Sequence, residues 1–185
     1  MSAREAEAPA DGGRRRHLLL AAVAASAALA GAGVAWRKWR PQPVPDDAAA
    51  AIWPLKFDSP GGAPLEMVRF QGKPLLLNFW ATWCPPCVEE MPLLDRFYRE
   101  NAANGWQVVG LALDQPEPVR QFLARLPVSF PIGLAARGGH ELSRTLGNLA
   151  GGLPFTVVVG ADGGLLQRRM GRVTDADLAQ WRSLR

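Results

Sequence analysis

Residues 75–92, LLLNFWATWCPPCVEEMP, carry the pattern that decides the fold, and they include both cysteines of the 185-residue chain. The run Leu75–Trp80 is apolar on both faces, which is typical of a buried central strand. Pro85 suits the first turn of a helix, where a missing N–H costs nothing. The helix-forming residues that follow continue to Pro92, which should kink the helix. The stretch therefore predicts a strand that leads through the cysteines into a helix.

Strand and helix patterns alternate after this stretch, which predicts an α/β domain whose partly parallel sheet is covered on both faces. Further strands are expected at residues 106–113, 128–133, 155–159 and 165–170, and further helices at 117–126, 141–146 and 175–185. The turn 161–164 should join the last two strands into an antiparallel hairpin, and Thr174 or Asp175 should cap the last helix. The length and the 48% hydrophobic content fit one well-buried domain, which we expect over residues 52–185.

The residues before that domain predict a membrane anchor or an export signal. Residues 1–17 end in a basic cluster, residues 18–36 form an uncharged alanine-rich run near the minimum length of a membrane-spanning helix, and residues 37–51 form a proline-rich tether. One interpretation is a signal anchor that stays in the membrane, and another is a signal peptide removed after Ala30 or Ala32. A mobile tail on a cytosolic protein is the third interpretation.

The tryptophans and cations at residues 36–40 favour the anchor, because they resemble an interfacial belt with snorkelling cations. We therefore expect an inner-membrane protein with a single N-terminal helix and its domain in the periplasm, or a soluble periplasmic protein if the leader is cleaved. The net charge of +4 comes mainly from the basic clusters around the apolar run. The domain lacks the basic stripe that nucleic acids require, so no nucleic-acid partner is expected.

The two cysteines predict redox exchange rather than metal binding. A tetrahedral zinc site needs four ligands, and the chain has only two cysteines and two histidines, one of them His17 in the leader. Covalent haem needs a histidine directly after the second cysteine, where Val88 stands. A disulfide across so short a loop removes little entropy from the unfolded chain, which argues against a purely structural role. We expect no metal and no cofactor besides a redox-active disulfide. A metal- or haem-binding module built on the cysteines stays as the alternative from another functional class.

Cys84 and Cys87 have different expected roles. Cys84 precedes the helix, whose N-terminus favours its thiolate, so we expect it to be the nucleophile and the more exposed sulfur. Cys87, one turn inside the helix, would resolve the mixed disulfide. Because Pro85 and Pro86 lack a backbone N–H, only the Cys87 amide is left near the Cys84 thiolate. Weak thiolate stabilisation of this kind should make the pair a reductant.

Residues 57–184 resemble the thioredoxin superfamily, and residues 72–92 are similar to the TlpA-like (ResA and DsbE type), membrane-tethered thiol:disulfide reductases. The resemblance rests on a strand ending in NFWATWC, the cysteine spacing, Pro92 eight residues after Cys84, and Gly152-Leu153-Pro154 before the penultimate strand. It implies a thioredoxin-like fold with a central mixed sheet flanked by helices. It also implies that Pro154 is a cis-proline that pairs, with the Leu153 backbone, with an extended substrate.

The same resemblance implies a proton-handling role for Glu90, three residues after Cys87. Helical geometry puts Glu90 near the edge of the face that carries Cys87, so we expect partial burial. The alternative is a solvated glutamate, as we expect for Glu89. A carboxylate there would raise the pKa of both thiols and could pass a proton to the leaving thiolate. Asn78 stands where thioredoxin has an acid, and its amide cannot accept a proton.

Apolar residues beside the cysteines are expected to bind the substrate. Trp80 should lie in the core, whereas Trp83, with Pro85 and Pro86, should form an exposed collar where a substrate peptide docks. Phe155 departs from the polar residue often found after the family's cis-proline.

The resemblance implies an envelope protein that accepts electrons from a membrane thiol reductase and reduces disulfides in exported proteins. Apocytochrome c is the leading substrate class that it suggests. A disulfide oxidant or isomerase is the alternative within the redox class. A peroxiredoxin-type peroxidase is disfavoured, because Ala81 stands where that family has Thr or Ser.

Overall fold

The computed structural model describes residues 47–184. The basic n-region expected at residues 1–17, the anchor or signal helix at 18–36 and most of the tether at 37–51 lie outside these residues. Within 47–184, no helix combines the length and apolar character needed to cross a membrane.

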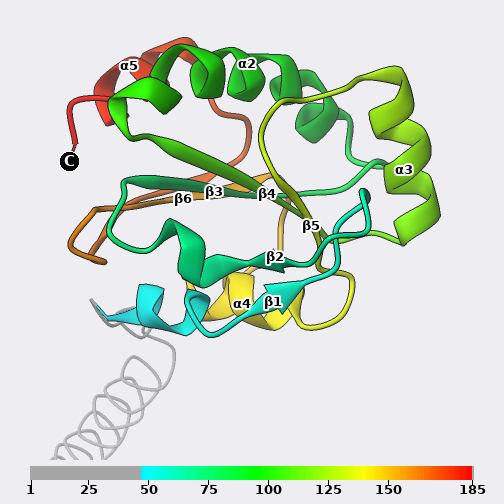
Figure 1. Cartoon of the computed structure of the whole chain (residues 1–185), viewed down its shortest axis with the longest axis horizontal. Coiled ribbons are helices and arrows are strands. Elements are labelled where there is room, and N and C mark those ends of the chain that lie inside the picture. The colour runs from blue at the N-terminus through cyan, green and yellow to red at the C-terminus, as the bar shows by residue number, and fades with distance from the viewer. Residues whose placement is uncertain (1–46, 185) are drawn as a thin grey trace, which may run out of the picture. The chain divides into compact units, whose positions relative to one another are not determined.

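A five-stranded mixed sheet forms the centre of the described domain (Figure 1). Its strands, in spatial order, are β5 (Ile132–Leu134), β4 (Gln107–Ala112), β3 (Leu75–Trp80), β6 (Phe155–Val159) and β7 (Leu165–Met170). β3 runs parallel to β4 and antiparallel to β6, and β6 and β7 form the expected antiparallel hairpin. The fold class is therefore confirmed as thioredoxin-like α/β, with a central mixed sheet between helices.

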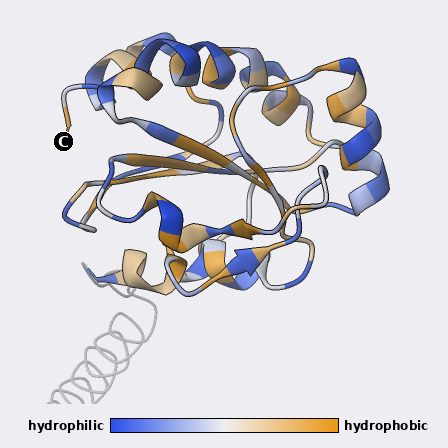
Figure 2. Cartoon of the chain, viewed as in Figure 1, coloured by the Kyte–Doolittle hydropathy of each residue, from blue (hydrophilic) through white to orange (hydrophobic). Residues whose placement is uncertain are grey.

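The alternating side chains of β3 divide the core between the two faces of the sheet. Leu76 and Trp80 face the cluster that contains residues of α2 (Pro85–Asn101), α3 (Pro116–Arg125) and α5 (Asp175–Trp181). The neighbouring residues Leu75, Leu77 and Phe79 belong to the second cluster, under α4 (Gly139–Thr145) and the 3-10 helix η1 (Ala48–Ile52). All six β3 residues are buried, as expected for a central strand. Figure 2 shows the hydrophobic residues concentrated along the strands and the hydrophilic ones on the outer sides of the helices.

The beginning of the domain differs from the sequence prediction. The tether was expected to run to residue 51, but Ala48–Ile52 forms η1, and Ala49 and Ile52 are fully buried in the core. A domain start at residue 52 is therefore too late by four residues. The alanines have no amphipathic pattern that would separate a packed helix from a linker, so no local pattern marks the domain boundary here.

The smaller elements between η1 and β3 were not anticipated. They are the two-residue antiparallel strands β1 (Lys56–Phe57) and β2 (Leu65–Glu66) and the 3-10 helix η2 (Met67–Phe70). A further 3-10 turn, η3 (Ala102–Asn104), follows α2. Strands of two residues are too short to show a period-2 pattern, which explains why the sequence did not reveal them.

Several element ends also moved. The strand expected at 128–133 is only β5, and the helices expected at 117–126 and 141–146 begin one and two residues earlier, at Pro116 and Gly139. The last helix stops at Trp181 rather than continuing toward residue 185. The shifts of one and two residues at the helix starts are normal for helix ends, whereas β5 and the last helix are four residues shorter at one end than expected.

Candidate functional site

Cys84 and Cys87 form a disulfide at the end of β3, with their Cα atoms 5.3 Å apart. Cys84 is the N-cap of α2 and has extended backbone angles, while Cys87 lies one turn inside the helix. Both are buried, but Cys84 is 5% exposed and Cys87 is 0% exposed, so Cys84 is the more accessible residue, in line with the expectation that it is the nucleophile. Attack on a substrate disulfide is therefore assigned most naturally to Cys84.

The first turn of α2 offers very few N–H groups to Cys84. Pro85 and Pro86 have none, and the N–H groups of Cys87 and Val88 both donate to the carbonyl oxygen of Cys84, at 3.0 and 3.1 Å. The Cys87 amide was expected to be the donor nearest the sulfur, but in this disulfide form the Cys84 backbone occupies it. The helix start therefore provides even less stabilisation for a thiolate than the sequence suggested.

Glu90 is buried on α2, three residues after Cys87. Only 1% of its surface is exposed, which is deeper than the expected partial burial, and the solvated alternative is wrong. Its Oε1 accepts a hydrogen bond from Asn78 Nδ2 at 2.8 Å, and its Oε2 accepts one from Val173 N at 2.7 Å. Burial raises the pKa of the Glu90 carboxyl from 4.5 to about 7, against the opposing effects of Val173, Asn78 and Arg172.

Glu89, the neighbouring acid, is exposed as expected. Its Oε2 accepts a hydrogen bond from Arg172 Nη1 at 2.6 Å, with both side chains more than half exposed. The helix turns Glu90 inward and Glu89 outward, so two consecutive carboxyls lie in very different environments. The buried one, with its pKa raised to about 7, is suited to exchange a proton near neutral pH.

The peptide bond between Leu153 and Pro154 is cis, which confirms the expectation for Pro154. Pro154 directly precedes β6, and Phe155 pairs in register with Phe79, one residue before the end of β3. The cis-proline and the loop that carries Cys84 therefore lie at the same end of the sheet. Phe155, where a polar residue was the family expectation, is buried, and its ring centroid lies 5.9 Å from that of Phe79.

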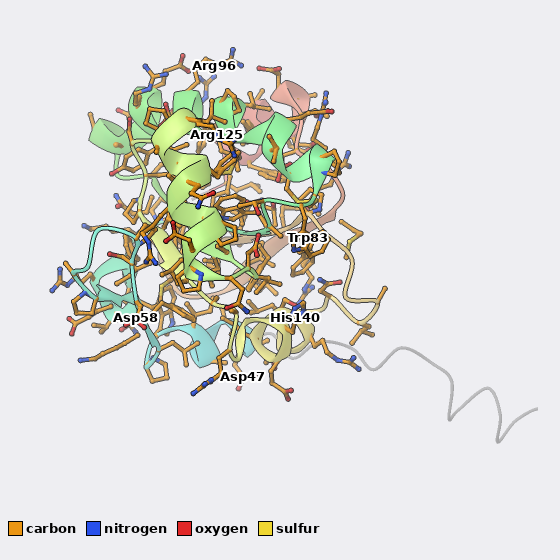
Figure 3. The ribbon with its side chains drawn as sticks, turned by 90° about the vertical axis from the view of Figure 1, so that its right-hand side faces the viewer. Asp47, Asp58, Trp83, Arg96, Arg125 and His140 are labelled. Atoms are coloured by element: carbon orange, nitrogen blue, oxygen red, sulfur yellow. A yellow bond between two sulfur atoms is a disulfide. The ribbon has the colours of Figure 1, made fainter. Side chains whose placement is uncertain are left out.

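The side chains expected to touch a substrate lie mostly at the surface. Trp83, which directly precedes Cys84, is 64% exposed (Figure 3), and Pro85 and Pro86 are exposed on the first turn of α2. Leu153 is half-buried, and Trp80 is fully buried, as predicted for a core residue. The structure thus brings an exposed apolar collar, the disulfide and the cis-proline to one end of the domain.

The Redoxin family model matches residues 42–180 of the chain. The chain belongs to the Redoxin family. It is 31% identical over 121 residues to the thiol-disulfide oxidoreductase ResA of Bacillus thuringiensis subsp. konkukian, a match that covers 65% of this chain and 68% of the relative. A ResA of Halalkalibacterium halodurans is 30% identical over 128 residues, covering 66% and 68% of the two chains.

Solved structures agree with this assignment. A thioredoxin-related protein from Neisseria meningitidis serogroup B is 33% identical, with a TM-score of 0.58 over 64% of this redoxin and 89% of that chain. A thiol:disulfide interchange protein described as DsbE, from Chlorobium tepidum, is 25% identical with a TM-score of 0.58, covering 69% and 87%. Together with the bonded cysteine pair, these relatives make this redoxin a thiol-disulfide oxidoreductase of the ResA and DsbE type.

Two polar partners of Glu90 in this redoxin were not foreseen. Asn78 donates from the same Nδ2 to Thr156 Oγ1 at 2.9 Å, so that α2, β3 and β6 share one buried polar group. Val173, in the segment between β7 and α5, supplies the backbone N–H. Thr156 follows Phe155 in an apolar strand, and a threonine there is ordinary strand composition, so the sequence held no signal for it. A backbone donor is invisible in any sequence.

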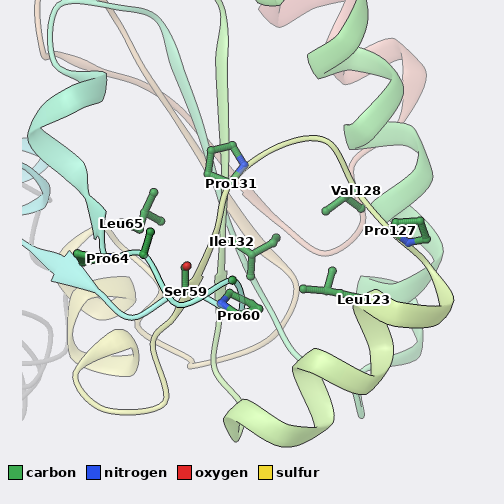
Figure 4. Close-up of a pocket in the computed structure, with 11 residues that line it drawn as sticks. Ser59, Pro60, Pro64, Leu65, Leu123, Pro127, Val128, Pro131 and Ile132 are labelled. Carbon is green, nitrogen blue, oxygen red and sulfur yellow. The ribbon is translucent and has the colours of Figure 1, made fainter.

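The described residues contain no group of three or more His, Cys, Asp or Glu side chains that could hold a metal ion. An apolar hollow of about 310 Å³ lies between the β1–β2 connection and the segment from α3 to β5 (Figure 4). Its lining includes Ser59, Leu123 and Ile132, but none of the residues of the disulfide site. The hollow is therefore separate from the redox chemistry.

Proposed function

We propose that this redoxin acts as a reductant, passing electrons from the Cys84–Cys87 dithiol to disulfides in exported proteins. The Cys84 thiolate attacks a substrate disulfide, forming a mixed disulfide and releasing one substrate thiol. Cys87 then attacks the Cys84 sulfur, which releases the second substrate thiol and leaves the disulfide seen in the structure. Two electrons pass to the substrate, and the dithiol of a membrane thiol reductase restores the pair.

The observation that carries the proposal is the buried Glu90 carboxyl, three residues after Cys87 on the same helix, with its pKa raised to about 7. When ionised, it disfavours a thiolate at the cysteines by charge repulsion, and when protonated, it can give a proton to the leaving thiolate. The first helical turn adds no compensating donors, because Pro85 and Pro86 lack N–H groups. A dithiol whose thiolate is poorly stabilised gives up its electrons readily, which is the property of a reductant.

The apolar end of the domain supports a polypeptide as the substrate. Trp83, Pro85 and Pro86 would contact side chains next to the target cysteine, while the backbone at Leu153 and Pro154 would pair with the extended chain. The likeness to ResA and DsbE proteins supports an envelope location and makes apocytochrome c the leading substrate class. In that arrangement residues 18–36 anchor the chain in the inner membrane and the domain faces the periplasm.

The test uses the full-length chain, reduced and freed of excess reductant. It is mixed with a peptide that contains an internal disulfide in a Cys-X-X-Cys-His sequence, and with the same peptide in which the cysteine spacing is changed. We expect two peptide thiols to appear for each Cys84–Cys87 disulfide formed, faster for the first peptide, and no reaction for Cys84→Ser.

The reverse mixture contains the oxidised chain and the reduced peptide. Stable transfer of the disulfide to the peptide would make the protein an oxidant and overturn the proposal. Equal rates for the two peptides would remove apocytochrome c as the preferred class while leaving the direction of electron flow intact.

A further inference from the structure

A carboxylate outside the predicted site holds the loop that presents Cys84. Asp114 lies just beyond β4, and its Oδ2 accepts hydrogen bonds from both the backbone N–H of Thr82, at 3.0 Å, and the Thr82 hydroxyl. Its Oδ1 accepts a third bond from Gln115 N at 2.7 Å. Asp114 and Thr82 are partly buried. One side chain therefore joins the end of β4 to the loop that leaves β3.

The held loop is short and its other connections are few. Leu113 N donates to Trp80 O at 2.8 Å, which fixes where β3 ends, and Cys84 N donates to Ala81 O at 3.2 Å, which closes a tight turn. Thr82 and Trp83 occupy the middle of that turn. Among the hydrogen bonds of residues 47–184, the two from Thr82 to Asp114 are the ones that tie the middle of the turn to the neighbouring strand.

We propose that Asp114 is a positioning residue for the disulfide chemistry, acting through Thr82 to hold Cys84 within bonding reach of Cys87. A disulfide needs the two cysteines in one narrow geometry, here with a Cα separation of 5.3 Å, whereas two separate thiols do not. A loop held in advance lowers the entropy lost when the ring closes, so it favours the disulfide over the dithiol. Releasing the loop makes the disulfide easier to reduce.

The reaction that reports this effect is the exchange of the protein with glutathione. Two glutathione thiols reduce the Cys84–Cys87 disulfide, giving the dithiol and one oxidised glutathione, so that two electrons enter the protein. The inference depends only on this exchange and not on the direction of electron flow proposed above. A wild-type potential that contradicted a reductant would leave the comparison between variants fully informative.

The variants separate the hydroxyl arm from the rest of the contact. Thr82→Val keeps the size of the side chain but removes its O–H donor, whereas Thr82→Ser keeps the donor and removes the methyl group. Asp114→Ala removes both hydrogen bonds from Thr82, together with the one from Gln115 N. We expect the equilibrium constant for reduction by glutathione to rise about tenfold in Asp114→Ala, or about 30 mV. The expected rise is smaller in Thr82→Val and absent in Thr82→Ser.

The second measurement is thermal unfolding of the full-length chain in both redox forms. If Asp114 positions the pair, Asp114→Ala and Thr82→Val lower the unfolding temperature of the oxidised form more than that of the reduced form. Equal losses in both forms, with equilibrium constants within twofold of wild type, would reduce Asp114 to a structural contact and overturn the inference. Should Asp114→Ala fail to fold, the comparison of Thr82→Val with Thr82→Ser tests the proposal instead. If these two variants had the same equilibrium constant for reduction, the proposal would be overturned.

Discussion

The N-termini of α2 and α5 are capped in two different ways. At α5, Thr174 Oγ1 accepts a hydrogen bond from Asp177 N at 3.2 Å, and Asp177 Oδ2 accepts one from Thr174 N at 2.9 Å, which completes a capping box. At α2, Cys84 occupies the same N-cap position without any side-chain hydrogen bond. The N-terminus of α5 is capped by reciprocal hydrogen bonds, whereas the side chain of the α2 N-cap makes none.

A helix N-terminus therefore stabilises a cysteine thiolate only if backbone N–H groups there are free to donate to the sulfur. An N-cap side chain accepts from the second or third helical residue, and at α2 these are Pro86, which has no N–H, and Cys87, whose N–H is bonded to Cys84 O. The buried acid Glu90 follows Cys87 by three residues on the same helix. Both features should disfavour a thiolate at Cys84, and the proposed role as a reductant rests on that expectation.

The largest effect is expected when either cysteine of the pair is replaced. Cys84→Ser should abolish thiol–disulfide exchange, since the attacking sulfur is lost, while the fold is kept because serine is close to cysteine in size and suits the extended backbone of an N-cap. Cys87→Ser should instead accumulate a mixed disulfide with substrate, which gel shift under non-reducing conditions detects. Efficient turnover by Cys84→Ser would contradict the assigned roles.

Glu90→Gln should remove a pH dependence of stability from the oxidised protein. Because the pKa of Glu90 is raised from 4.5 to about 7 by folding, the folded state binds more protons than the unfolded state across that interval. Wild-type stability should therefore fall as pH rises from 4.5 to 7, by about 3 kcal/mol at about 1.4 kcal/mol per pKa unit. Denaturant unfolding measures it.

Glu89→Gln is the matched control, because Glu89 is exposed on the same turn and pairs only with Arg172 at the surface. We expect its pH profile to follow that of wild type. If Glu90→Gln kept the full slope, or Glu89→Gln lost it, the assignment of the titration to the buried carboxyl would be wrong.

Pro86→Ala should make the α2 start more like an ordinary cap. The new N–H lies at the second helical position, where it can donate to the Cys84 thiolate, and a hydrogen bond to a charged group is worth about 1.5–3 kcal/mol, equivalent to about 30–60 mV. The reduction potential should rise by that amount. Pro85→Ala is the control, because an N–H at the first helical position does not reach the cap, so identical shifts in both variants would contradict the account.

Thr174→Ala should have the smallest effect. Losing the capping hydroxyl costs about 1 kcal/mol of unfolding free energy, and Thr174→Ser should restore it. The reduction potential should stay at the wild-type value, since this cap does not contact the cysteines. A shifted reduction potential would contradict this prediction, because it would show that the cap of α5 influences the cysteine pair at the start of α2.

The core elements of the fold followed from hydrophobic periodicity and proline position. Leu75–Trp80 and Phe155–Val159 were expected as strands with these bounds, because short runs that are apolar or rich in β-branched residues and follow a proline favour buried strands. The buried alanines of η1 and the two-residue strands β1 and β2 were missed, because they are too short or too uniform to carry a period. The cap of the last helix was expected at Thr174 or Asp175, and the structure shows Thr174 as the N-cap, with Asp177 completing a capping box.

The redox pair was foreseen from residue type and spacing, whereas the cis-proline was foreseen from the resemblance to the thioredoxin superfamily. The full burial of Glu90 was not, since it depends on Asn78 from β3 and on the Val173 backbone 83 residues away. The contact between Asp114 and Thr82 spans 32 residues and two strands. Contacts of this kind come from tertiary packing, which brings distant segments together in ways that local patterns do not record.

The most direct test of the account is the reduction potential of the Cys84–Cys87 pair in the full-length chain. The chain is equilibrated against glutathione or dithiothreitol buffers, the thiols are trapped by alkylation, and the fraction reduced is fitted to the two-electron couple. If the pair is a reductant, we expect a reduction potential near or below about −220 mV, where thioredoxins and glutaredoxins lie. A value near about −120 mV, that of a strong disulfide oxidant, would contradict it.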